Sequence, residues 1–152
     1  MTVAADSIGQ TNITRMAGTW LLVDFARIVG REVVTRPLGH RPTGQLTYQP
    51  NGRMSALLMR AKRPWHQSRT FFEASDNDRS AAALGFTGYG GTYDVNGSVV
   101  THHVQVSLYP DHVGTDLVRS ISWVDDRLVL RTTSQRTRSG RQFHDHLEWR
   151  PA

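Results

Sequence analysis

Short segments in which apolar and polar residues alternate run through most of the chain, with turn residues between them. Such segments are typical of β-strands that have one buried face. Asn96-Gly97 and Pro50-Asn51-Gly52 are strong hairpin signals, because both tolerate the dihedral angles of tight turns. The pattern predicts about nine strands, and so an all-β sandwich or barrel. The predicted strands cover residues 20–29, 32–36, 46–48, 54–59, 91–95, 98–108, 118–123, 128–132 and 143–149.

Two segments depart from this alternation. Residues 1–14 are mostly polar and unpatterned, and are predicted to form a flexible N-terminal tail before a single domain at 15–152. Residues 71–84 contain Ala81-Ala82-Ala83 and few β-branched residues. This composition favours one or two short helices inserted between strands.

Alternation assigns ionisable side chains to the predicted interior. His102 falls on the apolar face of its strand with Val104, Val106 and Leu108. Asp145 aligns with Leu147 and Trp149 in the last strand. In the same way, Asp24 aligns with Trp20 and Leu22, Arg119 with Ile121 and Trp123, Tyr48 with Leu46, and Tyr93 with Val95.

Several ionisable groups inside a solid core are costly unless they are paired. A barrel with a ligand cavity accommodates them, because a few polar groups in an apolar pocket characterise small-molecule sites. A structural interpretation also stays open. In it, Asp145 and Arg119 form a buried ion pair, and His102 bonds to a backbone carbonyl.

Composition narrows the classes of function. The 152 residues suit one domain, cysteine is absent, and no apolar run approaches the length of a membrane-spanning helix. The first residues lack the features of a signal peptide, which predicts a cytoplasmic protein. The formal charge is +5, but the basic residues are scattered along the chain, so neither nucleic acid nor a membrane is expected as a partner.

Four histidines lie in a pattern that resembles a metal site. His144 and His146 share one strand face, and His102 and His103 lie in a strand that could be near, which would suit a cupin-like site. However, the face with His144 and His146 also carries Glu148 and is predicted to point outward. We therefore expect no metal and no cofactor.

Gly18-Thr19-Trp20, which opens the first strand, resembles the Gly-x-Trp signature of lipocalins. The wider chain resembles the bacterial and fungal lipocalin-like domain family in segments spread over about residues 15–150, and departs from it at Asp111-His112. The matching segments are residues 18–23, 44–48, 52–56, 88–93, 100–104, 107–110, 113–115, 119, 126–128 and 147–149. The resemblance implies a closed antiparallel lipocalin-like barrel of about eight to ten strands, with the helical insert at its mouth.

Two functions are compatible with these residues. The first is a cofactor-free isomerase, cyclase or lyase of secondary metabolism that acts on a small hydrophobic molecule. His102 would be its acid/base, and Asp145 and Arg119 would be the other catalytic residues. The alternative is a non-catalytic carrier of a hydrophobic or fatty-acid-like ligand. In either case the predicted ligand contacts are Asp24, Tyr48, Tyr93, Trp123 and Leu108. A homodimer is compatible with the sequence.

Overall fold

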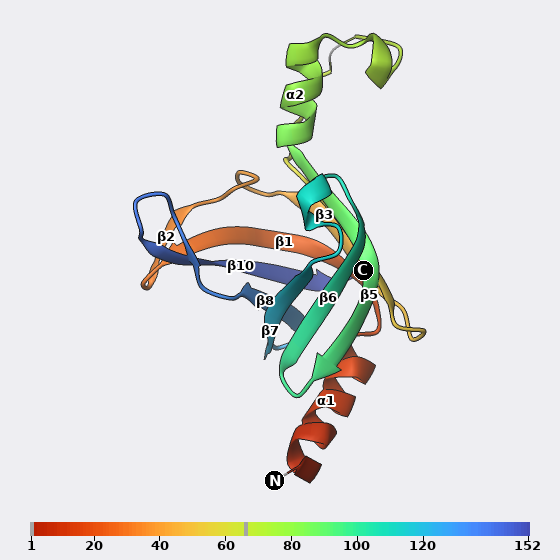
Figure 1. Cartoon of the computed structure of the whole chain (residues 1–152), viewed down its shortest axis with the longest axis vertical. Helices are drawn as coiled ribbons and strands as arrows, with labels where there is room; N and C mark the ends of the chain where they lie inside the picture. The colour runs from red at the N-terminus through yellow and green to blue at the C-terminus, as the bar shows by residue number, and fades with distance from the viewer. Residues whose placement is uncertain (1, 66) are drawn as a thin grey trace.

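In a computed structural model, residues 2–65 and 67–152 are described, with side chains from residue 7 onward. They form an antiparallel β-barrel (Figure 1) that closes in the order β1-β3-β4-β5-β6-β7-β8-β10, with β10 pairing back to β1. The short strands β2 and β9 lie outside this closed order and pair with β1 and β10. The elements are α1 (Thr2–Met16), β1 (Gly18–Val29), β2 (Glu32–Thr35), β3 (Thr43–Tyr48), β4 (Arg53–Met59), η1 (Phe71–Glu73), α2 (Asp76–Leu84), β5 (Phe86–Asn96), β6 (Val99–Ser107), η2 (Pro110–His112), β7 (Asp116–Val124), β8 (Arg127–Thr132), β9 (Gln135–Arg136) and β10 (Gln142–Pro151).

The predicted fold class is confirmed, and all nine predicted strands are present. The Asn96-Gly97 turn joins β5 to β6, and Gly97 has the positive φ of 59° that this turn requires. The main difference is that β5 begins at Phe86, five residues before the predicted start. This earlier start places Tyr89 in the barrel wall.

The N-terminal segment corrects the sequence prediction. A flexible tail was expected over residues 1–14, whereas the structure forms helix α1 from Thr2; Met1 lies outside the described residues. The helix exists because it buries a few side chains against the barrel: Asn12 and Met16 are buried although most of the described helix is exposed. A polar sequence with only a few apolar anchors gives little periodicity to detect.

Helix α1 closes one end of the barrel. The Asn12 amide donates to the Gly97 carbonyl oxygen over 2.8 Å, and the Trp123 indole N–H donates to the Asn12 side-chain oxygen over 3.0 Å. The Arg15 guanidinium lies 3.9 Å above the Trp123 ring. These contacts connect the helix to the β5–β6 turn and to β7.

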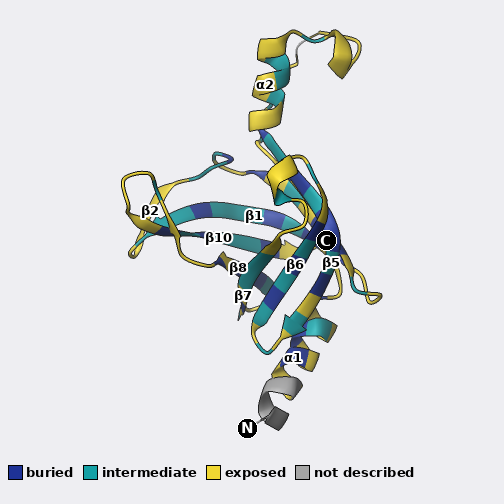
Figure 2. Ribbon diagram, in the orientation of Figure 1, coloured by how far each residue is buried: buried dark blue, intermediate teal, exposed yellow. Residues whose placement is uncertain are grey.

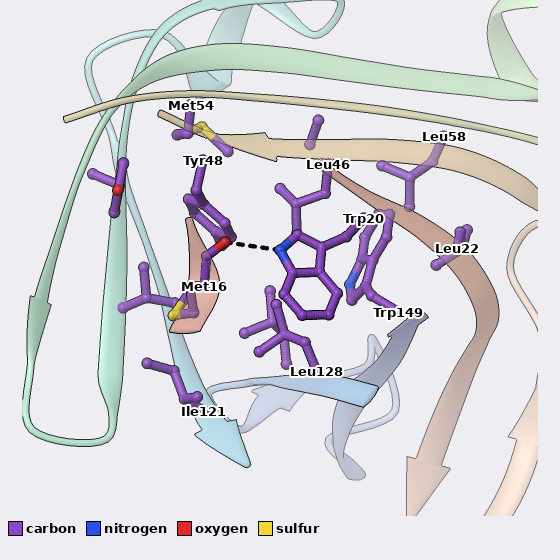
Figure 3. Packing of buried hydrophobic residues seen from close by; sticks show 14 of the residues in the cluster. Met16, Trp20, Leu22, Leu46, Tyr48, Met54, Leu58, Ile121, Leu128 and Trp149 are labelled. Atoms are coloured by element: carbon purple, nitrogen blue, oxygen red, sulfur yellow. Dashed lines mark hydrogen bonds between the residues drawn. The ribbon is translucent and has the colours of Figure 1, made fainter. Parts of the chain in front are cut away.

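The apolar core fills the half of the barrel next to α1 (Figure 3). Met16 and Trp20 are joined by a 2.8 Å hydrogen bond from the indole N–H to the Met16 carbonyl oxygen. Around them pack buried side chains from most strands of the barrel: Leu22, Leu46, Tyr48, Met54, Leu58, Ile121, Leu128 and Trp149. Packing at this end leaves the other half of the interior less filled.

The predicted helical insert is confirmed as η1 and α2. Helix α2 begins after Ser75, whose hydroxyl accepts from the backbone N–H of Asp78 as an N-cap. In Figure 1, α2 projects away from the end of the barrel opposite α1, and Figure 2 shows that it is largely exposed. The insert therefore stands beside the mouth but does not fold over it.

Two β-bulges change which side chains face inward. A register shift between Leu22 and Asp24 turns Phe25, not Asp24, toward the interior. A second shift, opposite Gly90 and Gly91 in the β5–β6 pair, leaves Gln105 as the extra residue of β6. Gly91 is required there, because a Cβ atom would lie 1.9 Å from the backbone oxygen of His103.

Replacement of Asn12 by alanine tests the role of α1. The substitution removes the bond to Gly97 and leaves the Trp123 N–H without its acceptor. We expect the free energy of unfolding to fall by about 2 kcal/mol, measured by chemical denaturation. The control is Gln10→Ala, on the exposed side of the same helix; equal stability of the two variants would contradict this role.

Candidate functional site

A cavity of about 390 Å³ occupies the half of the barrel that the core leaves open. Its size falls within the usual range for small-molecule pockets, roughly 300–1,000 Å³. The walls combine apolar side chains with a few polar ones. The lining residues are Phe25, Leu46, Ala56, Leu58, Thr87, Tyr89, His102, His112, Asp116, Leu117, Val118, Arg119, Leu130, Thr132, Thr133, Gln135, Asp145, Leu147 and Trp149.

Burial of the lining residues separates the floor of this cavity from its mouth. Leu46, Ala56 and Trp149 are buried and form the floor against the core. Asp116 and Gln135 are exposed, so they mark the mouth. The cavity therefore opens away from α1, at the end where α2 and η2 lie (Figure 1).

His102, on β6, is held between two tyrosine hydroxyls. Its Nε2 lies 2.6 Å from the hydroxyl oxygen of Tyr48, and its Nδ1 lies 2.8 Å from that of Tyr89. Tyr48 is fully buried in the core, whereas Tyr89 lines the cavity. The three side chains thus connect the packed half of the barrel to the open half.

The number of donors and acceptors assigns the donor in each hydrogen bond of the Tyr48–His102–Tyr89 group. A neutral imidazole has one N–H and one lone pair, so it donates to one tyrosine and accepts from the other. Tyr48 has no other acceptor among the described residues, so its O–H donates to Nε2, and Nδ1–H donates to Tyr89. The reverse arrangement would leave a buried Tyr48 O–H without a partner, which costs about 1–3 kcal/mol.

The imidazole of His102 is neutral at physiological pH. Burial, with smaller contributions from Arg119 and His103, lowers the pKa of His102 from 6.5 to about 3. Burial also raises the pKa of Tyr89, although the charge of Arg119 and its hydrogen bond to the hydroxyl act in the opposite direction. The three hydrogen-bonded side chains, Tyr48, His102 and Tyr89, are therefore all uncharged.

Asp145 lines the cavity as predicted, but its carboxylate is already engaged. Arg27, directly opposite on β1, donates to both carboxylate oxygens over 2.8 and 3.0 Å. The same guanidinium lies 4.2 Å above the Phe143 ring. The structural pair considered from the sequence therefore forms with Arg27 and not with Arg119.

Arg119, on β7, also lines the cavity, and it keeps its charge uncompensated. It donates to the Val118 carbonyl oxygen over 3.0 Å. Within residues 7–65 and 67–152, no carboxylate forms an ion pair with it. Its positive charge thus acts on the cavity and on the hydroxyl of Tyr89.

His102, Arg119 and Asp145 are thus brought to one cavity, but the predicted ligand contacts are not among its lining residues. Asp24 lies outside the cavity after the Leu22/Asp24 bulge and pairs with Arg36 at 3.0 Å. Leu108 is 48% exposed, because the β6 bulge and the end of the strand turn it outward. The remaining three predicted contacts, Tyr48, Tyr93 and Trp123, belong to or pack against the core.

Most lining residues were not predicted as part of the site, and two of these, Tyr89 and Trp149, carry hydrogen-bonding groups. Tyr89 lies before the predicted start of its strand at residue 91, although its spacing of two residues from Gly91 and four from Tyr93 indicates the same face. The sequence only aligns Trp149 with Asp145 and Leu147 on the inner face of the last strand. Trp149 forms part of the cavity floor, and its buried indole N–H has no hydrogen-bond partner in the described part of the chain.

A second histidine lies on the outer face beside the mouth. His103 Nε2 is 2.5 Å from Asp94, and Nδ1 is 2.7 Å from Asp116. The hydrogen bonds to Asp94 and then Asp116 raise the pKa of His103. The protonated ring thus bridges β5 and β7 across β6, and its single positive charge is shared between Asp94 and Asp116.

The described residues hold neither a cluster of possible metal ligands nor a helix that could span a membrane. They include no group of three or more side chains arranged to hold a metal ion. No helix among them is both long and apolar enough to cross a lipid bilayer.

An antiparallel barrel that is closed at one end and holds an apolar cavity with a few polar groups defines a small-molecule-binding class of protein. Residues 17–150 match the model of the lipocalin-like domain, and the chain belongs to this family. A curated relative, a 4'-hydroxy-3'-methoxypropiophenone carrier protein from Aspergillus oryzae, is 30% identical over 105 residues. The alignment covers 64% of this chain and 95% of the relative. The fold and this relative support ligand binding.

Tyr48→Phe tests the buried hydrogen-bond chain. Loss of the hydroxyl leaves the Nε2 lone pair of His102 without a donor, so we expect the free energy of unfolding to fall by about 2 kcal/mol. Tyr109→Phe, which removes an exposed hydroxyl, serves as the matched control. If chemical denaturation gave both variants the stability of the parent, the hydrogen bond between Tyr48 and His102 would not contribute to stability as proposed.

The two histidines predict opposite pH dependences of stability. The pKa of His103 is raised on folding, so its contribution is complete below about pH 6.5 and is lost as pH rises through the folded pKa. The pKa of His102 is lowered to about 3, so stability falls as pH drops below about 6.5. His103→Gln should therefore abolish part of the decline on the alkaline side. Urea unfolding at a series of pH values measures this, and an unchanged profile would argue against the bridge.

Proposed function

We propose that the protein is a non-catalytic carrier that holds one small, mainly apolar molecule in the barrel cavity. The observation that carries this proposal is the cavity itself, about 390 Å³ with a buried floor and one open end. Apolar walls provide the free energy of transfer from water, and the few polar groups orient the ligand.

The chemistry of His102 and Asp145, two of the three predicted catalytic residues, favours carriage over catalysis. Both nitrogens of His102 are bonded to tyrosines, and its pKa of about 3 makes it a weak base at neutral pH. The carboxylate of Asp145 is neutralised by Arg27. A general acid/base needs a free site and a pKa near the working pH, and neither group meets both conditions. An isomerase, cyclase or lyase activity therefore remains an untested prediction with less support.

A ligand class is suggested by the relative that carries 4'-hydroxy-3'-methoxypropiophenone. This compound is a flat aryl ketone with further oxygen substituents. A body of that shape suits walls built from Phe25, Leu58 and Leu147, and its oxygens can meet the donors of Tyr89 and Trp149. We infer an aromatic ligand of comparable size for this chain.

Binding is tested by titrating the protein with 4'-hydroxy-3'-methoxypropiophenone while tryptophan fluorescence is recorded, because Trp149 lines the cavity. We expect saturable quenching at one site. Ala56→Leu adds three carbon atoms inside the cavity and should weaken binding about tenfold or more, which corresponds to about 1.4 kcal/mol.

The matched control is Ser55→Leu, which places the same side chain on the exposed face of the same strand and should bind like the parent. Circular dichroism verifies that both variants are folded. Equal affinities of the two variants would place the ligand outside the cavity. Recovery of the ligand unchanged after incubation supports a carrier, whereas a new product would overturn this proposal in favour of an enzyme.

A further inference from the structure

The charged groups that line the cavity do not cancel. Asp145 is paired with Arg27, and Asp116, which is exposed to water at the mouth, shares protonated His103 with Asp94. Arg119 lines the same space and has no carboxylate partner in the part of the chain that the structure describes. One positive charge is therefore left facing the cavity.

The hydroxyl of Tyr89 adds a second donor beside this charge. Its oxygen accepts from Nδ1–H of His102 and from Arg119, so its own proton is free to be donated elsewhere. At the floor, the indole N–H of Trp149 is buried and has no acceptor among the described residues. The polar groups that remain unsatisfied are thus donors.

An uncompensated cation beside apolar walls favours an anion more strongly than it would in water. Phe25, Leu130 and Leu147 give the cavity apolar walls, and electrostatic attraction is stronger where the effective dielectric constant is low. The planar guanidinium of arginine binds an oxyanion through paired N–H groups. The cavity is therefore complementary to an anionic oxygen carried on an apolar body.

The geometry points to a ligand that is bound as an oxyanion, a phenolate or a carboxylate on a flat apolar body, with its charged oxygen held by Arg119 and the hydroxyl of Tyr89. This inference rests on the proposed binding of a small molecule in the cavity. It adds the ionisation state of that molecule and the two residues that select it.

Three probes of nearly equal shape separate charge from shape: 4-nitrophenol, 4-nitroanisole and 4-nitrobenzoate. Their affinities are measured by displacement of the neutral dye N-phenyl-1-naphthylamine. At a pH where 4-nitrophenol is ionised, we expect it to bind about tenfold more tightly than its methyl ether 4-nitroanisole. The ratio between the two anions then distinguishes a phenolate from a carboxylate ligand.

A spectroscopic readout is independent of affinity. Ionised 4-nitrophenol absorbs at longer wavelength than the neutral form, so the protein should convert the bound probe to phenolate at a pH where the free probe is mostly neutral. The expected decrease in the pKa of the bound probe is about one unit, a tenfold shift. The cavity is also lined by the titratable groups His102, His112, Asp116 and Asp145. These groups are the same for every probe, so they do not account for a difference between probes.

Variants assign the effect to Arg119. Arg119→Gln should reduce the preference for 4-nitrophenolate over 4-nitroanisole about tenfold, while Arg119→Lys should retain most of it. Arg131→Gln removes the same charge from an exposed position of β8 and should leave the preference unchanged. Undiminished binding of the neutral dye by Arg119→Gln verifies that the cavity is intact.

The outcomes separate this inference from the proposed function. If 4-nitroanisole binds as tightly as the two anions, the cavity binds small apolar molecules and the inference is overturned. If none of the probes displaces the dye, or the dye itself does not bind, the proposed function fails and the inference with it. An anion preference that persists in Arg119→Gln would overturn the assignment to Arg119.

Discussion

The interior of the barrel depends on one neutral imidazole that is buried between two tyrosine hydroxyls. Because His102 accepts from Tyr48 and donates to Tyr89, both imidazole nitrogens and the Tyr48 hydroxyl are hydrogen-bonded without a charge in the core. Tyr48 belongs to the packed core and Tyr89 to the cavity wall. The hydrogen bonds through His102 therefore fix the boundary between the core and the cavity. Apolar side chains at these positions would fill space but would not orient a donor toward the cavity.

Alternation along the strands predicted an all-β sandwich or barrel and the inward facing of three ionisable side chains, and the resemblance to the lipocalin-like family implied the closed barrel. His102, Arg119 and Asp145 were each placed on the inner face by their spacing from apolar neighbours, and all three line the cavity. Alternation assigns the wrong face where a strand contains an extra residue. Beyond the Leu22/Asp24 shift, Phe25 takes the inward position predicted for Asp24, and beyond the Gly90/Gly91 shift, Leu108 turns outward. A bulge reverses the facing of every later residue and has no reliable signature in one sequence.

Pairing between distant strands was also beyond the sequence. Arg27 and Asp145 are 118 residues apart, and only the closure of β1 on β10 brings them opposite each other. This pairing determines which arginine is left without a carboxylate partner. Had Asp145 paired with Arg119, as the structural interpretation supposed, Arg27 and not Arg119 would carry the uncompensated charge. Because Arg27 takes that role, Arg119 remains as an uncompensated cation.

The same pairing bears on the choice between carriage and catalysis. Catalysis by proton transfer requires a group that changes its protonation state during the reaction. His102 is neutral and bonded at both nitrogens, and the Asp145 carboxylate is bonded at both oxygens, so each is stabilised in the form it already has. Fixed donors around an apolar space bind a ground state well, and equal binding of ground and transition states does not accelerate the chemical step. The geometry of this barrel is therefore better suited to retaining a molecule unchanged than to converting it.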